Sequence, residues 1–140
     1  MATGEDYRKI FHSEADENQE ELNRLFAVLE KDYSSKKSID AIFRVTRSLK
    51  AIAVGMGFKP IGALALGLED VFAQIRLGNL VLEVGVFSEL QQGLNVLSAL
   101  IDGLKTGEKV KYLGVKTKLN VILLKLNEEK KADSKIVNRH

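Results

Sequence analysis

Cysteine and tryptophan are absent from this 140-residue chain, and it contains only one proline and two histidines. Without cysteine there is no disulfide scaffold, no thiolate zinc site and no cysteine nucleophile. Two histidines also leave little for a histidine-rich metal site, so we expect neither a metal ion nor another cofactor. Long apolar runs are missing as well, because Lys or Gly interrupts them, and the N-terminus has no apolar stretch of signal-peptide type. We therefore expect a cytoplasmic protein that does not enter a membrane.

Charged residues make up 29% of the chain and apolar residues 45%, a composition typical of one globular domain. The net charge is only +2, but the two signs are separated along the chain. Residues 1–34 carry 4 basic and 9 acidic groups, whereas residues 105–140 carry 10 basic and 4 acidic groups. Solvated helix faces explain this separation most simply. The basic segment lacks interleaved aromatic residues and compact arginine clusters, and we do not expect a nucleic-acid partner.

Apolar residues recur every three or four positions, which predicts amphipathic helices rather than strands. The pattern indicates long helices over about residues 5–31, 36–56, 60–77 and 86–106. A shorter apolar face from Leu119 to Leu126 predicts a fifth helix, and the chain from about residue 128 is expected to be loose. Short connections favour antiparallel neighbours. The expected fold class is all-α, an up-down antiparallel four-helix bundle with an additional C-terminal helix.

The same pattern suggests how the chain is divided. We expect the helical bundle to occupy residues 1–108, and residues 109–140 to form a basic C-terminal helix and a flexible tail.

Four glycines fall inside predicted helices, where each costs about 1 kcal/mol relative to alanine. They are Gly62, Gly67, Gly93 and Gly103. Close approach between helix backbones would offset this cost, so we expect these glycines to mark tight helix contacts. Gly57 has a different role, because it is placed to end the second helix in the left-handed conformation. The Gly55-Met56-Gly57 tripeptide is only a weak phosphate-loop signal, since no strand precedes it.

Two stretches of the chain carry a family resemblance. Residues 42–58 read IFRVTRSLKAIAVGMGF, and residues 64–70 read LALGLED. They resemble the histidine-containing phosphotransfer (HPt) domain at the N-terminus of CheA-type chemotaxis histidine kinases. In that family the second helix reads aromatic-Arg, then His-Ser/Thr-Leu/Ile-Lys-Gly and a Gly-Phe turn, and the third carries Leu-x-His-x-x-Glu. The resemblance covers most of residues 8–105, including the runs EELNRL at 20–25 and LEKD at 29–32.

The departures from the family pattern fall on its chemistry. The resemblance places the phosphorylated histidine of the family at Arg47 and its accessory histidine at Leu66, and Ala51 stands where a small glycine is usual. A phosphoryl acceptor needs a nitrogen lone pair near pH 7, which neutral imidazole offers and a protonated guanidinium does not. We therefore expect no catalytic residue and no phosphorylation at Arg47. The residues that keep the pattern are Ser48, Leu49, Lys50 and Glu69.

The resemblance and these departures together imply a degenerate HPt domain. Such a module of two-component or chemotaxis-type signalling is not an enzyme by itself. It would dock a response-regulator receiver domain or a histidine kinase without carrying phosphate, and it could be one part of a larger histidine kinase. Receiver domains of the family's usual partners present an acidic cluster, which suits a positive docking site. The expected docking residues are Arg47, Lys50, Glu69, Ser48, Ala51 and Leu66.

Three alternatives stay open. An active phosphotransfer domain would have to use another histidine, and His12 is the candidate because His140 lies in the expected flexible tail. A structural or oligomerising bundle would form a homo-oligomer through an apolar patch and ignore receivers. Arg47 and Lys50, three residues apart on one helix face, could also form an ordinary surface ion pair with Glu69, worth about 0–1 kcal/mol.

Overall fold

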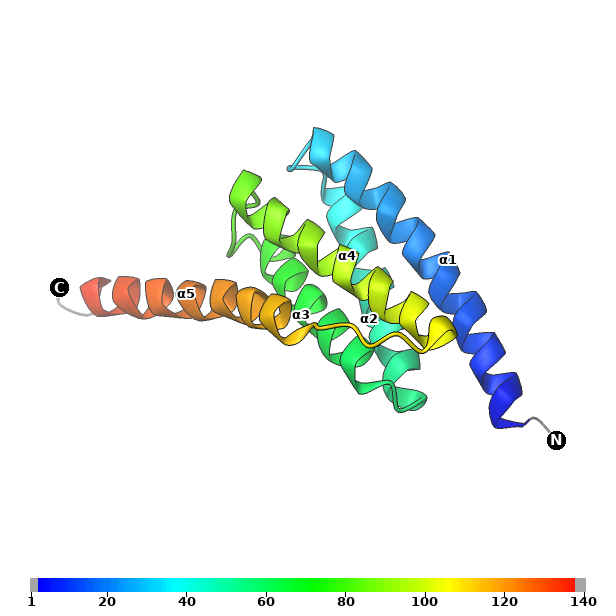
Figure 1. The fold of residues 1–140 in the computed structure, drawn as a ribbon. Helices are drawn as coiled ribbons and strands as arrows, with labels where there is room; N and C mark the ends of the chain where they lie inside the picture. The colour runs from blue at the N-terminus through cyan, green and yellow to red at the C-terminus, as the bar shows by residue number, and fades with distance from the viewer. Residues whose placement is uncertain (1–2, 138–140) are drawn as a thin grey trace.

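A computed structural model describes residues 3–137, which form five helices joined by short connections (Figure 1). The helices are α1 (Gly4–Lys31), α2 (Lys36–Gly55), α3 (Lys59–Arg76), α4 (Val84–Thr106) and α5 (Leu113–Val137). Within residues 3–137 there is no strand, and no helix is long and apolar enough to cross a membrane. The all-α fold class is confirmed, and the first four helices begin and end within two residues of the predicted positions.

Helices α1 to α4 form the bundle. Each packs against the next one along the chain, and α1 closes the ring by packing against α4. Their short connections make consecutive helices antiparallel (Figure 1). Among the described residues α5 packs on α3 and α4, and its C-terminal part runs away from the bundle (Figure 1). The predicted four-helix bundle with an additional C-terminal helix is confirmed.

The core is built from the apolar residues that the helical period places on the inner faces. Aromatic rings from three helices meet in it, since the Phe26 ring centroid lies 5.7 Å from that of Phe72 and 6.0 Å from that of Phe87. Burying one large apolar side chain stabilises the fold by about 1.5–3 kcal/mol. Many such side chains from all four bundle helices hold α2 and α3 side by side. The large, fully buried aliphatic residues of the core include Leu22, Leu29, Ile42, Leu49, Leu64, Leu68, Leu90 and Leu94.

Helix α2 has defined hydrogen-bonded ends. At its start the Ser35 hydroxyl accepts a hydrogen bond from the backbone N–H of Ser38. At its end the Phe58 N–H donates to the Ala53 carbonyl at 2.9 Å, and the Gly57 N–H donates to the Val54 carbonyl at 3.1 Å, as in a Schellman motif. Gly57 has a φ of 77°, which confirms the predicted left-handed glycine. This tight turn brings α3 back along α2.

Gly67 and Gly93 form a notch between α3 and α4. A Cβ atom at Gly67 would lie 3.2 Å from Cδ1 of Leu119, and one at Gly93 would lie 3.6 Å from the same atom and 3.0 Å from Cδ2 of Leu68. Leu119 of α5 is fully buried in this notch. The glycines therefore make room for an inserted side chain.

The other two helical glycines behave similarly. A Cβ at Gly62 would lie 3.1 Å from Cγ2 of Val54, and one at Gly103 would lie 2.7 Å from the backbone oxygen of Glu108. Tight contacts are thus present at all four predicted positions. The expected contact between helix backbones is present at Gly62, where a Cβ would lie 3.8 Å from the backbone nitrogen of Val54 on α2. It is absent at the other three, where the neighbours are side chains or, at Gly103, the backbone that follows α4.

Helix α5 is longer than the sequence analysis predicts. The segment expected to be loose is helical from residue 128 to Val137, and residues 138–140 of the expected tail lie outside the described residues. Residues 127–137 contain no glycine or proline and are rich in Glu and Lys, which favour helix. Leu119 and Leu126 attach α5 to the bundle, whereas residues 127–132 are exposed. A domain boundary at residue 108 stays a prediction.

Candidate functional site

The outer surface of α2 and α3 brings together three charged residues that the sequence analysis singled out. Nζ of Lys50 lies 2.7 Å from Oε2 of Glu69, and Nε of Arg47 lies 3.9 Å from Oε1 of the same carboxylate. Lys50 and Arg47 come from adjacent turns of α2, and Glu69 comes from the facing helix α3. The predicted ion pairing between the two helices is therefore present.

The two cations differ in their contact with Glu69. The Glu69 side chain is only 10% exposed, so its charge needs a close partner, and Lys50 supplies one by donating a hydrogen bond. The Arg47 side chain is 68% exposed and makes no hydrogen bond with any described residue. Lys50 and Glu69 thus form the close pair, and the guanidinium of Arg47 is available to another molecule.

Buried neighbours on α2 direct Arg47 outward. Thr46 is fully buried, with its hydroxyl 2.9 Å from the Ile42 carbonyl and 3.0 Å from the Phe43 carbonyl. Leu49 is fully buried as well. Because successive helical residues are about 100° apart, burial of positions 46 and 49 leaves position 47 on the exposed side. The core of the bundle therefore sets the orientation of the site.

Negative charge is crowded at this turn of α3. Partial burial raises the pKa of the Asp70 carboxyl, and the neighbouring Glu69 carboxylate raises it further. The Lys50 ammonium acts in the opposite direction and lowers the pKa of Asp70. Lys50 therefore compensates both carboxylates, which strengthens the case for a structural role.

Exposed apolar side chains lie next to the charges. Leu66 is 42% exposed, one turn before Glu69 on α3. Val54 is 64% exposed on α2 and lies against α3 at Gly62, one turn before Leu66. The sequence analysis missed Val54, although its spacing of seven residues from Arg47 places both on one side of α2. The remaining predicted residues, Ser48 and Ala51, are exposed on α2.

We call Arg47, Lys50, Glu69, Val54 and Leu66 the α2–α3 face. It combines an available guanidinium, a compensated ion pair and exposed apolar groups on two helices that the core holds in place.

A second ion pair joins the same helices nearer the start of α2. Nε of Arg76 lies 3.0 Å from Oδ1 of Asp40, and the Arg76 guanidinium carbon lies 4.8 Å from the centroid of the Phe43 ring. The sequence analysis missed this cluster, because an ion pair between two helices depends on how the helices pack and not on a local pattern. It ties α2 to α3 beyond the α2–α3 face.

His12 lies on α1, and none of its recorded contacts joins it to the α2–α3 face. The centroid of its ring lies 5.8 Å from the centroid of the Phe11 ring, in an edge-to-face arrangement. Its Nδ1 atom is buried without a hydrogen-bond partner among the described residues. His140 lies outside the described residues. In the part of the chain that the structure describes, no cluster of three or more His, Asp or Glu residues could hold a metal ion.

Comparison with known proteins supports the family resemblance by sequence, although no family model matches the chain. The chain is 30% identical over 105 residues to the chemotaxis protein CheA of Halobacterium salinarum, a match that covers 74% of this chain and 16% of that protein. It is 28% identical over 101 residues to CheA of Treponema pallidum, covering 72% of this chain and 12% of that protein. The chain thus spans about a sixth or less of the length of these relatives.

The fold has a close counterpart among solved structures. The CheA phosphotransferase domain from Thermotoga maritima matches with a TM-score of 0.68 and 24% sequence identity, covering 74% of this chain and 98% of that domain. By sequence and by fold, this chain is homologous to the N-terminal phosphotransfer (HPt) domain of CheA.

Proposed function

We propose that this chain is a degenerate HPt domain, which binds a signalling partner without carrying phosphate. The observation that carries the proposal is Arg47, an exposed guanidinium at the position that the resemblance assigns to the phosphorylated histidine. A guanidinium stays protonated and offers no lone pair to a phosphoryl group. HPt domains are phosphotransfer modules and not catalysts, so a domain without the acceptor keeps docking as its activity.

The chemistry of the α2–α3 face supports docking of an acidic partner. Lys50 is engaged by Glu69, whereas Arg47 can form a bidentate pair with a carboxylate or an aspartyl phosphate. The exposed Val54 and Leu66 supply apolar contact area beside this cation. A receiver domain, with acidic residues around its phosphorylatable aspartate, has the complementary surface. A histidine kinase is the second partner class that the homology suggests.

Phosphorylation tests the first half of this proposal. We expect an active chemotaxis-type kinase with labelled ATP to leave the wild-type chain unlabelled, while a conventional HPt domain in the same reaction takes up label. Stoichiometric, acid-labile label on the wild-type chain would contradict the proposal. If that label mapped to His12, it would favour an active domain with a relocated acceptor.

Restoring the histidines tests whether the site is degenerate in more than one position. Arg47→His should accept phosphate slowly, and adding Leu66→His should raise the rate by more than the sum of the single effects, because both groups act in one site. Ser48→His is a matched control that places imidazole about 100° around α2, and it should stay unlabelled. If Arg47→His alone reached the rate of a conventional HPt domain, Leu66 would have no part in the degeneration.

A further inference from the structure

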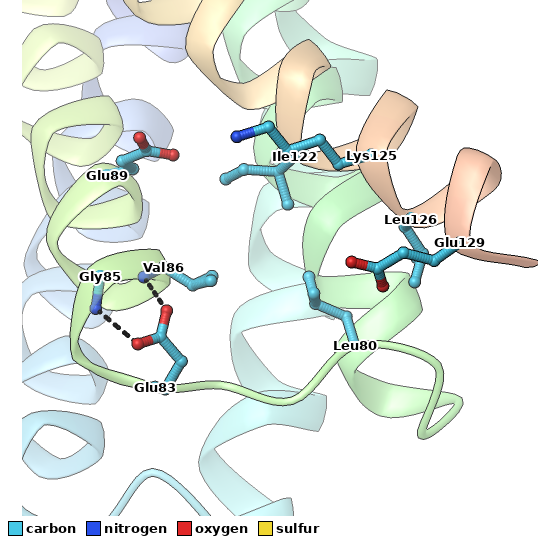
Figure 2. Close-up of a pocket in the computed structure, with 9 residues that line it drawn as sticks. All are labelled: Leu80, Glu83, Gly85, Val86, Glu89, Ile122, Lys125, Leu126 and Glu129. Atoms are coloured by element: carbon cyan, nitrogen blue, oxygen red, sulfur yellow. Dashed lines mark hydrogen bonds between the residues drawn. The ribbon is translucent and has the colours of Figure 1, made fainter.

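A groove lies between α4 and α5 (Figure 2), and it shares no lining residue with the α2–α3 face. Its lining is apolar in the middle and charged at the rim. Figure 2 shows Glu83 and Glu89 on the α4 side, and the ends of the Lys125 and Glu129 side chains pointing into the groove from α5. The apolar lining residues are Leu80, Val86, Ile122 and Leu126.

Some charges of the groove are engaged within the chain and others are not. Glu83 caps α4, accepting hydrogen bonds from the Val86 N–H at 2.9 Å and the Gly85 N–H at 3.2 Å. Neither Lys125 nor Glu129 has an ion-pair partner among the described residues. With three glutamates and one lysine, the groove is acidic. Val81, two residues before Glu83, and Val84, the residue after it, are exposed and extend the apolar area beside it.

Residues 127–132 of helix α5 are not covered by the rest of the described chain. Beyond Leu126, its last recorded buried residue, the helix continues for roughly three turns, and residues 127–132 are exposed. It projects from the bundle (Figure 1). Most helical stability in proteins comes from packing of one face, so this part of α5 is a candidate for packing against another chain. α5 is also basic, with six lysines and three acidic residues.

We propose that the groove is filled by α5 of a second copy of this chain, so that the two α5 helices pair antiparallel about a two-fold axis. Ile122, Lys125, Glu129 and Ala132 recur at spacings of three and four and share one side of α5. The antiparallel register that puts Lys125 opposite the second copy's Glu129 also puts Ile122 opposite the second copy's Ala132. Symmetry repeats both contacts, as an isologous interface requires.

Charge and space both favour this occupant. Lys125 and Glu129 give this face of α5 one charge of each sign, so the antiparallel register brings opposite charges together at both symmetric contacts. In the proposed register positions 117–126 of one α5 lie opposite positions 137–128 of the other, so the second bundle lies alongside the projecting end of the first α5. No bundle helix has to move, because α5 already projects from the bundle (Figure 1).

Sedimentation velocity of the whole chain over a range of concentrations tests the proposal. We expect reversible dimerisation of the wild type. Lys125→Glu and Glu129→Lys each place like charges opposite one another at both symmetric contacts, and each should weaken dimerisation by about tenfold or more. An equimolar mixture of these two variants should dimerise again. In the mixed dimer, the two glutamates of the Lys125→Glu chain lie opposite the two lysines of the Glu129→Lys chain. An effect confined to one chain could not produce this rescue.

Lys131→Glu is the matched control, since it makes the same charge change on a different side of α5 and should leave dimerisation unchanged. Far-UV circular dichroism of every variant verifies that α5 stays helical. A wild type that stays monomeric at every concentration would overturn the proposal. So would a mixture of Lys125→Glu and Glu129→Lys that stays monomeric, or a Lys131→Glu variant that dimerises as weakly as Lys125→Glu.

Discussion

Alanine at Gly67 should destabilise the protein while Leu119 is present and stabilise it once Leu119 is shortened to alanine. The added Cβ would lie 3.2 Å from Cδ1 of Leu119. Leu119 is fully buried and already lies close to the Cβ position of Gly93, 3.6 Å away, so it has little room to move toward α4. The effect of Gly67→Ala on the free energy of unfolding should therefore change sign when Leu119 is replaced by alanine.

The expected magnitudes follow from two opposing effects. Overpacking a core costs about 1–3 kcal/mol, while replacing glycine by alanine within a helix gains about 1 kcal/mol. Gly67→Ala alone should thus lower the free energy of unfolding by about 0–2 kcal/mol, and Leu119→Ala alone by about 2–5 kcal/mol. In the Leu119→Ala background the new methyl no longer meets Cδ1, and the helix gain of about 1 kcal/mol should appear. The two substitutions should therefore be coupled by about 1–3 kcal/mol.

Urea denaturation followed by far-UV circular dichroism measures all four corners of this double-mutant cycle. Gly114→Ala is the control, because a Cβ at that position would have no neighbour within 4 Å and should have the same effect in both backgrounds. An equal effect of Gly67→Ala with and without Leu119 would refute the notch, and with it the attachment of α5 through Leu119.

Two further predictions use the same denaturation assay. Gly57→Ala should destabilise the fold by about 1 kcal/mol because its φ of 77° disfavours a side chain, whereas Gly55→Ala, with no neighbour within 4 Å and no positive φ, should stabilise it by about 0.5 kcal/mol. If Gly55→Ala lowered the free energy of unfolding as much as Gly57→Ala, this prediction would be contradicted. Burial and Glu69 raise the folded-state pKa of Asp70, so its ionisation opposes folding above that pKa and has no effect below the unfolded value. Asp70→Asn should therefore stabilise the protein near pH 7 and lose this gain in acid, and an equal gain at both pH values would refute the assigned pKa shift.

The fold follows from sequence wherever local physics decides it. The helical period places Thr46 and Leu49 in the core and thereby turns Arg47 outward, so the position of the guanidinium could be predicted before its surroundings were known. Gly57 could be predicted as well, because a glycine after a periodic segment is the common way to end a helix. These features depend on residues that are close in sequence.

Features that depend on distant residues were harder to predict. The sequence indicates that Gly67 and Gly93 need close neighbours, but it cannot tell that Leu119 of α5 is the shared neighbour. Which of the two cations forms the close pair with Glu69 depends on the distance between α2 and α3. Lys50 forms it, and Arg47 stays available. Val54 was missed because a single exposed valine does not belong to any periodic apolar or charged pattern along α2.

The central claim is that the domain docks a signalling partner through Arg47 without carrying phosphate. Titration calorimetry with a receiver domain at low and high salt tests it most directly, using the wild type, Arg47→Ala and Arg24→Ala. Arg24 is the matched control, because its side chain is 62% exposed and lies on α1, away from the α2–α3 face.

We predict that the wild type and Arg24→Ala bind alike, and that Arg47→Ala binds several-fold more weakly at low salt, with a smaller difference at high salt. Equal affinities of the wild type and Arg47→Ala at both salt concentrations would contradict the account and make Arg47 an ordinary solvated residue.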